Sequence, residues 1–192
     1  MKITGHEDLR VQKTINGIYA AFEGLICEKD YEKITVTELA KRAQINKKTF
    51  YRYYPTLDDL LAEMQARYSQ DYLQVVGEFK YPQDLEKSVR SFIEYSAQQG
   101  EAYDKITCSG TYVGIRQQMI DQVMHQTWDA SPEFSRLTAW QQRILLNFIQ
   151  NTGLEIYKQW VATKKQAPME EVIQEAIVLM TSSVDEFLKK AE

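Results

Sequence analysis

Lysine, threonine and tyrosine side chains are concentrated in one short segment near the start of the chain. Their ammonium and hydroxyl groups are among the donors that proteins direct at phosphate oxygens, and such contacts fix the position of a protein on a duplex. Lysine also binds guanine O6 and N7 in the major groove, and a threonine methyl can contact the methyl group of thymine. The candidate DNA contacts are Thr35, Thr37, Lys47, Lys48, Thr49, Tyr51 and Tyr53.

Two short helices must position these side chains. Thr35 with Glu38 three residues later is a capping box, which predicts a helix that begins after Thr35. A three-residue turn follows, and Asn46 at its end can cap a second short helix through Tyr53. Pro55 ends that helix, because helices seldom include the residue before a proline. Two short helices joined by a tight turn form a helix-turn-helix, whose second helix can enter the major groove.

A longer amphipathic helix precedes this pair and ends near Lys29. Its apolar residues recur at steps of three and four, which places them on one face. Phe50 and Tyr54, four residues apart, are expected to face the core that the three helices share. The apolar face consists of Val11, Ile15, Ile18, Tyr19, Phe22, Leu25 and Ile26.

The charge of the chain is distributed unevenly. Residues 9–54 hold nine basic and five acidic side chains, whereas residues 55–192 hold thirteen basic and twenty acidic side chains. A basic first segment joined to an acidic remainder indicates a module that binds a polyanion, carried on a body with another role. The alternative is a basic helical hairpin whose charges are only solvated surface.

The remainder of the chain is also helical in pattern. Thr56 and Asp59 form a second capping pair, which starts a helix that ends near Val76. No stretch alternates as a pair of strands would. We therefore expect an all-α fold with a three-helix DNA-binding domain at 1–55 and a helical domain at 56–192. The later helices are expected at 83–98, 101–109, 112–128, 138–163 and 168–190.

The segment from Thr35 to Leu60, TVTELAKRAQINKKTFYRYYPTLDDL, resembles the DNA-binding signature of the tetracycline-repressor (TetR/AcrR) family. The resemblance implies a transcriptional regulator, in most members a repressor, that binds a near-palindromic operator on double-stranded DNA as a dimer. It also implies release from DNA by a small-molecule inducer. The positions in register are Leu39, Ala40, Ala43, Ile45, Thr49, Tyr51, Tyr54, Pro55 and Leu60.

Three residues depart from the family pattern. Gln44 stands where the family usually has glycine, so we expect the backbone there to avoid the left-handed region. Lys48 replaces a residue that is often small, and it adds a side chain that can reach a base or a phosphate. Leu57 replaces a lysine that commonly contacts phosphate, which removes one electrostatic contact.

The resemblance further implies that 56–192 is a ligand-binding and dimerisation domain. The dimer would form through the last two long helices, at about 138–163 and 168–190, which would make a four-helix interface. Aromatic and methionine side chains can line an adaptable pocket for the inducer, although such a stripe is more often simply core. The pocket candidates are Tyr68, Phe92, Tyr95, Tyr103, Tyr112, Met119 and Trp128.

Other functional classes find little support in the sequence. The chain has no glycine-rich phosphate loop or nucleophile-elbow motif, so we expect that the protein is not an enzyme. Cys27, Cys108, His6 and His125 show none of the short spacings of zinc ligands, and we expect neither a metal nor a cofactor. The longest apolar run, at 176–180, is too short to cross a membrane, so we expect a cytoplasmic protein.

A second functional hypothesis comes from Leu57. A protein that kept this fold but lost a phosphate contact could act as a dimerisation or coactivator protein through a protein partner. DNA binding without salt dependence or sequence preference would favour that alternative.

Overall fold

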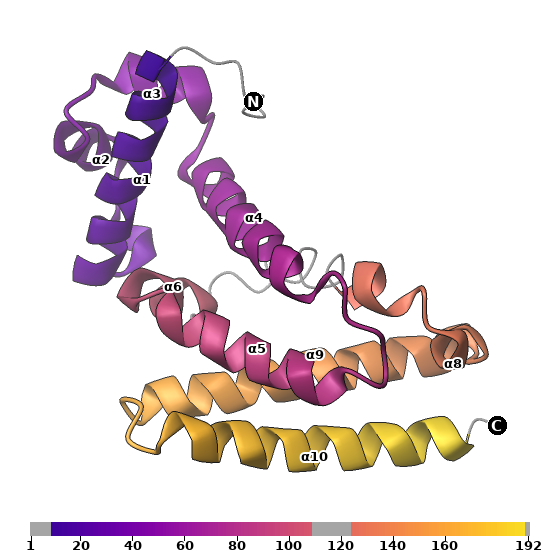
Figure 1. The fold of residues 1–192 in the computed structure, drawn as a ribbon. Helices are drawn as coiled ribbons and strands as arrows, with labels where there is room; N and C mark the ends of the chain where they lie inside the picture. The colour runs from indigo at the N-terminus through magenta and orange to yellow at the C-terminus, as the bar shows by residue number, and fades with distance from the viewer. Residues whose placement is uncertain (1–8, 109–123, 191–192) are drawn as a thin grey trace. The chain divides into compact units, whose positions relative to one another are not determined.

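The computed structural model describes residues 9–108 and 124–190, and every regular element within these ranges is a helix (Figure 1). This confirms the all-α expectation. The chain divides into two compact units, Met1–Ala66 and Arg67–Glu192. The predicted domain boundary between residues 55 and 56 stays a prediction. Of the helix expected at 112–128, the structure describes only 124–128, which are helical.

The first unit is built on α1 (Leu9–Glu28), which packs against α2 (Val36–Arg42), while α2 packs against α3 (Lys47–Tyr53). A single 3-10 turn, η1 (Tyr31–Lys33), connects α1 to α2. The expected face of α1 is buried from Ile15 onward, and α1 packs against α2. Phe50 and Tyr54 are buried as predicted. The buried residues of α1 are Ile15, Ile18, Tyr19, Ala21, Phe22, Leu25 and Ile26.

Side-chain caps determine where the helices of this unit begin. The Thr35 hydroxyl accepts a hydrogen bond from the Glu38 amide at 3.3 Å, as predicted. The other half of the expected capping box is wrong, because the Glu38 carboxylate accepts a hydrogen bond from the Lys29 ammonium at 2.6 Å. An ammonium group attracts this carboxylate more strongly than a neutral backbone amide does.

The helix after Pro55 is α4 (Leu57–Val76), and two reciprocal hydrogen bonds between Thr56 and Asp59 cap its start. The Thr56 amide donates to the Asp59 carboxylate at 2.9 Å, and the Asp59 amide donates to the Thr56 hydroxyl at 3.1 Å. This is the predicted capping pair in full. Helix α4 continues past Ala66, so its first half belongs to the first unit and its second half to the other.

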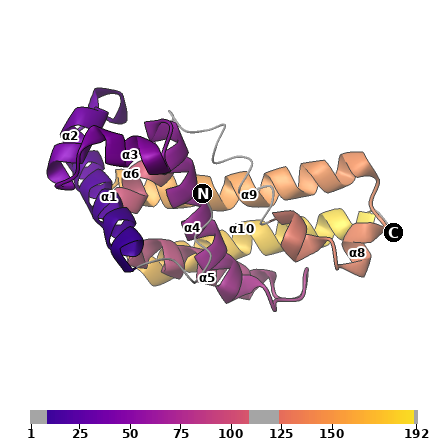
Figure 2. The same ribbon diagram turned by 90° about the horizontal axis from the view of Figure 1, so that it is seen from above.

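The second unit contains the second half of α4 and the later helices. Helix α10 packs along both α5 and α9, and Figures 1 and 2 show α9 and α10 as long neighbours. The bounds of these helices are α5 (Leu85–Gln98), α6 (Glu101–Cys108), α8 (Pro132–Ser135), α9 (Ala139–Ala162) and α10 (Met169–Lys190).

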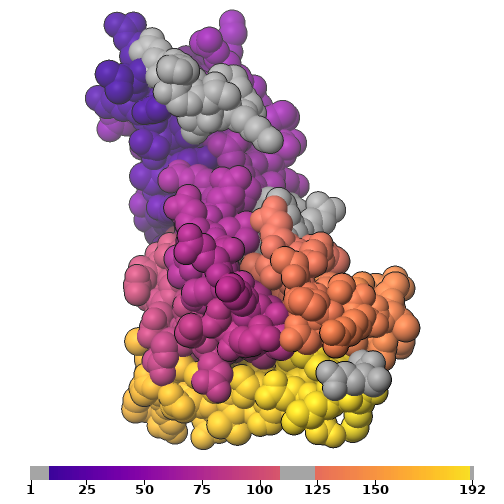
Figure 3. All heavy atoms as spheres, turned by 45° about the vertical axis from the view of Figure 1, so that its right-hand side comes forward, coloured from indigo at the N-terminus to yellow at the C-terminus, as the bar shows by residue number. Residues whose placement is uncertain are grey.

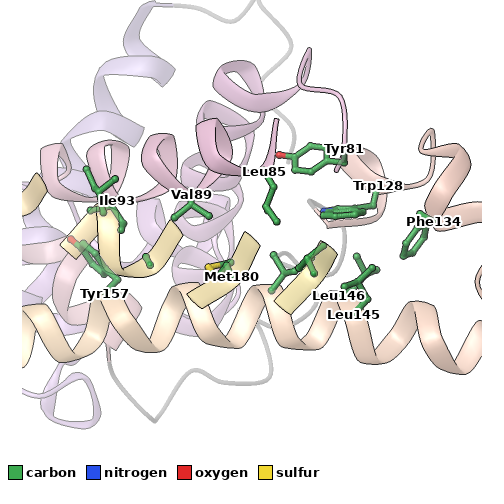
Figure 4. Packing of buried hydrophobic residues seen from close by; sticks show 14 of the residues in the cluster. Tyr81, Leu85, Val89, Ile93, Trp128, Phe134, Leu145, Leu146, Tyr157 and Met180 are labelled. Atoms are coloured by element: carbon green, nitrogen blue, oxygen red, sulfur yellow. The ribbon is translucent and has the colours of Figure 1, made fainter. Parts of the chain in front are cut away.

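The core of this unit lies between α5, α9 and α10. Figure 4 shows Val89 and Ile93 of α5, Leu146 and Tyr157 of α9, and Met180 of α10 within this layer. Burial of side chains of this size stabilises a fold by about 1.5–3 kcal/mol each. The three helices are therefore held mainly by apolar packing.

An ion pair also connects α5 to the start of α10. The Arg90 guanidinium donates to both carboxylate oxygens of Glu170, each at 2.7 Å. These hydrogen bonds lower the pKa of Glu170 to about 2. A lowered pKa in the folded state means that the pair is intact above the ordinary pKa of glutamate and is lost only as the pH falls toward 2.

None of the helices described within residues 9–108 and 124–190 is both long and apolar enough to span a bilayer.

The turn between α2 and α3 differs from expectation. Gln44 adopts a left-handed backbone with φ of 55°, although we expected it to avoid that region. The Gln44 amide donates to the Lys41 carbonyl at 3.2 Å, and the Ile45 amide donates to the Ala40 carbonyl at 2.9 Å. These two bonds form a Schellman motif, which requires a left-handed residue at the position of Gln44. The backbone hydrogen bonds of the turn therefore hold Gln44 in a left-handed conformation that residues with a side chain rarely adopt.

We predict that Gln44→Gly stabilises the protein by about 0.5–1 kcal/mol, because glycine adopts a positive φ without the steric cost that other residues incur. Ala43→Gly is the matched control. Ala43 has a right-handed backbone, with φ of −74°, so glycine there should only destabilise. Urea unfolding followed by circular dichroism measures both changes. An unchanged or lower stability for Gln44→Gly would contradict the prediction.

Candidate nucleic-acid interface

The candidate DNA contacts lie on the two short helices of the first unit. Thr35 and Thr37 stand at the start of α2 and are exposed, and the other candidates lie on α3. Lys47 and Lys48 form the exposed first turn of α3. The exposed candidates on these helices are Thr35, Thr37, Lys47, Lys48 and Tyr51, while Thr49 and Tyr53 are half-buried.

The start of α3 is fixed by Asn46. Its side-chain oxygen accepts hydrogen bonds from the Thr49 amide at 2.7 Å and from the Thr49 hydroxyl at 3.0 Å. The Thr49 proton is therefore engaged within the protein, which leaves the methyl group of Thr49 for an outside contact. A threonine methyl is suited to contact with the thymine methyl in the major groove.

Several cations of the first unit form ion pairs, and Lys47 and Lys48 differ from them. Lys29 pairs with Glu38, Lys33 with Asp30, and Arg42 with Glu28, all at 2.6–2.7 Å. Within residues 9–108 and 124–190, no acidic side chain forms an ion pair with Lys47 or Lys48. The positive charge at the start of α3 is therefore not neutralised by neighbouring carboxylates and is available to an external anion.

Tyr51 borders a shallow depression that the sequence did not indicate. The ring of Tyr51 packs edge-on against Phe50 at 5.5 Å between centroids, and 53% of the residue is exposed. Leu57 lines the same depression, and the Tyr31 hydroxyl donates to the Asp58 carboxylate at its rim. The lining residues are Tyr31, Glu32, Ile34, Val36, Tyr51, Pro55, Thr56, Leu57 and Asp58.

The candidate pocket residues of the second unit do not all lie in one aromatic cluster. Tyr103 contacts the rings of Tyr68 and Tyr95 at 5.0 and 6.3 Å between centroids. Phe92 joins the same cluster through Tyr72 and Tyr157, each at 6.0 Å between centroids, and these two tyrosines were not among the candidates. Tyr112 and Met119 lie outside the described residues.

Trp128 belongs to a different aromatic group. Its ring packs on Tyr81 at 4.8 Å and on Phe134 at 6.0 Å between centroids, and Figure 4 shows Trp128 between Leu85 and Phe134. Trp128 is fully buried, and its indole N–H has no hydrogen-bond partner among the described residues. The side-chain amide nitrogen of Gln150, also buried, is likewise without an acceptor in the part of the chain that the structure describes.

Within residues 9–108 and 124–190, no group of three or more histidine, cysteine, aspartate or glutamate side chains is placed to hold a metal ion.

Residues 18–64 match the family model described as bacterial regulatory proteins of the tetR family. No curated protein is similar enough in sequence to be matched. The fold is similar to that of a TetR transcriptional regulator from Streptococcus agalactiae 2603V, with 20% identity and a TM-score of 0.64 over 89% of this chain and 95% of the other.

Two further solved structures show the same fold. The fatty acid degradation regulator FadR from Bacillus halodurans is 15% identical, with a TM-score of 0.63 over 88% of this chain and 94% of its own. The dihydroxyacetone kinase operon activator DhaS is 14% identical, with a TM-score of 0.55 over 91% of this chain and 97% of its own. These likenesses establish the helical fold across both units.

We predict that Asn46→Ala destabilises the protein by about 1 kcal/mol, because alanine cannot accept the hydrogen bond that caps α3. Asn46→Asp keeps an oxygen acceptor and is the matched control, with an expected change of a few tenths of a kcal/mol at most. Thermal unfolding of the two variants compares them directly. Equal stability of Asn46→Ala and the wild-type chain would show that α3 does not depend on this cap.

Proposed function

We propose that this chain, whose N-terminal domain belongs to the tetR family of bacterial regulatory proteins, is a transcriptional regulator that binds a near-palindromic operator as a homodimer. The observation that carries the proposal is the exposed pair Lys47 and Lys48, without ion-pair partners among the described residues, on the first turn of α3. In a helix-turn-helix the first residues of the second helix contact base edges.

The side chains divide into two roles in this proposal. Lys48 and the Thr49 methyl read bases, since both stand on the first turn of α3. The remaining candidates position the domain on phosphates through an ammonium group or hydroxyls. These are Thr35, Thr37, Lys47, Tyr51 and Tyr53. Because Leu57 supplies no charge beside Tyr51, the electrostatic attraction rests more heavily on Lys47 and Lys48.

The homodimer is supported by apolar side chains on the outer faces of α9 and α10. Trp140 is 66% exposed, Val178 is 60% exposed and Leu179 is 55% exposed. Figure 3 shows α10, coloured yellow, at the surface of the molecule. Two copies that joined these faces would bury them in a four-helix interface. A dimer would then present two α3 helices to successive major grooves about 34 Å apart.

The proposal includes an inducer that binds the second unit and favours a dimer whose α3 helices no longer match the grooves. Such a ligand must bind the released shape more tightly than the DNA-bound shape. The aromatic cluster around Tyr103 supports an apolar binding region, and the buried Trp128 and Gln150 donors would favour a ligand that carries acceptor atoms. We propose repression as the mode of regulation, and a cytoplasmic location follows from binding to operator DNA.

A second candidate is a coactivator that acts through a protein partner. The observation in its favour is the depression beside Tyr51, where Leu57 supplies an apolar wall and Glu32 and Asp58 supply carboxylates. Carboxylates beside a DNA-binding surface repel phosphate. The related fold of DhaS, which is described as an operon activator, shows that the fold also occurs in an activator.

We predict that Lys48→Ala weakens binding to a duplex selected by this protein from a random library by about 1–3 kcal/mol, because one base contact is lost. Binding to a scrambled duplex should change little. Fluorescence anisotropy at several salt concentrations measures both. Lys87→Ala is the control, because Lys87 lies on α5 and pairs with Asp84 at 2.6 Å.

An equal loss on both duplexes would instead make Lys48 a phosphate contact. Failure of the wild-type chain to enrich any duplex, with binding that does not depend on salt, would overturn the operator proposal in favour of the coactivator.

We predict that Leu179→Glu converts the dimer to monomers, because it would place a charge inside an apolar interface. Val75→Glu is the matched control, since Val75 is 46% exposed but lies on α4. Sedimentation velocity distinguishes the two states. A Leu179→Glu variant that sediments as the wild-type dimer would exclude this face of α10 from the interface.

A further inference from the structure

We propose that Glu63 is a positioning residue for the recognition helix α3, which it holds in place through the hydroxyl of Tyr54. This inference rests on the proposed DNA-binding function, because it concerns how the DNA-reading side chains are oriented. Glu63 does not lie on α3 and is not among the candidate DNA contacts. It lies on α4, within the first unit.

One carboxylate oxygen of Glu63 joins three helical segments. It accepts a hydrogen bond from the Tyr19 hydroxyl of α1 at 2.5 Å and from the Tyr54 hydroxyl at 3.2 Å. The two hydroxyls lie 3.4 Å apart. Tyr54 is the C-terminal capping residue of α3, and its amide donates to the Phe50 carbonyl. The Glu63 carboxylate therefore connects the end of α3 to both α1 and α4.

Burial of the Tyr54 hydroxyl lowers the stability of the fold unless a hydrogen-bond partner offsets the loss of water. Tyr54 is only 2% exposed, and its ring packs on Phe50 at 5.8 Å between centroids. A phenylalanine ring would fill the same space without a polar group, whereas a buried hydroxyl without a partner destabilises a protein. Burial raises the pKa of Tyr54 well above its usual range, so the hydroxyl remains a donor at neutral pH.

A fixed end of α3 matters because the helix is short and reads DNA at its other end. Seven residues of α-helix are about 10 Å long, so a tilt of about 6° around Tyr54 would move the first turn by about 1 Å. Hydrogen bonds to bases tolerate only a few tenths of an ångström. Loss of the contact with Glu63 would therefore impair base reading by Lys48 before it impaired the attraction of the positive charge to phosphate.

The test compares Glu63→Leu, which removes the acceptor oxygen, with Tyr54→Phe and the double variant in the full-length chain. Two quantities are measured, namely the ratio of affinities for the selected and scrambled duplexes and the hydrogen exchange of the amides at 47–54. Both single substitutions should lower the affinity ratio by about three- to tenfold, because a misplaced first turn of α3 weakens base contacts more than phosphate contacts. Each should also speed amide exchange in α3 more than in α2.

Tyr19→Phe is the matched control. It removes the other hydroxyl from the same carboxylate oxygen, but Tyr19 lies on α1 and not on α3. It should lower the thermal stability of the protein without lowering the affinity ratio. A purely structural role for Glu63 would make all three substitutions act alike.

The double variant decides whether Glu63 acts through Tyr54. We expect it to lose no more specificity than either single variant, because both remove the same contact. Additive losses, or an unchanged amide exchange in α3 of Glu63→Leu, would overturn the inference. A wild-type chain that prefers no DNA sequence would contradict the proposed function alone, and the amide exchange of α3 would still decide the role of Glu63.

Discussion

A helix of seven residues is not stable by itself in water, so α3 depends on contacts at both of its ends. At its start, Asn46 accepts the hydrogen bonds that an isolated first turn would lack. In its middle and at its end, Phe50 and Tyr54 are buried against the helices that surround it. The left-handed turn at Gln44 sets the direction in which α3 leaves α2. Each of these contacts acts on the orientation of the side chains that we propose to meet DNA.

The ion pairs of the first unit determine which positive charges remain available near α3. Near α1 and α2, Lys29 and Arg42 pair with glutamates of neighbouring elements. Exposed ion pairs contribute little to stability, but they neutralise charge locally. Lys47 and Lys48 form no ion pair with any described residue, so their ammonium groups leave positive charge at the start of α3 even though the whole chain has a net charge of −4. The uneven charge seen along the sequence thus corresponds to a localised surface in the first unit.

Local signals in the sequence predicted the local structure well. The caps at Thr35, Asn46 and Thr56 depend on residues three positions apart, and all three form in the structure. Features that require tertiary proximity were missed. Glu38 pairs with Lys29, which follows the end of α1, and one of the two partners of Glu63 is Tyr19, far earlier in the chain. The positive φ at Gln44 follows from a backbone hydrogen-bond pattern that side-chain type does not reveal. Aromatic content likewise could not separate Trp128 from the cluster around Tyr103.

The central claim is that the first turn of α3 enters the major groove in two successive half-sites. Dimethyl sulfate methylates guanine N7, which lies in that groove, so protection from methylation reports its occupancy. On a duplex selected by the protein, we expect protected guanines in two groups whose centres are about 10 base pairs apart. The Lys48→Ala variant should lose this protection before it loses attraction to the duplex. Full methylation of every guanine in a duplex that the wild-type protein demonstrably binds would contradict the account.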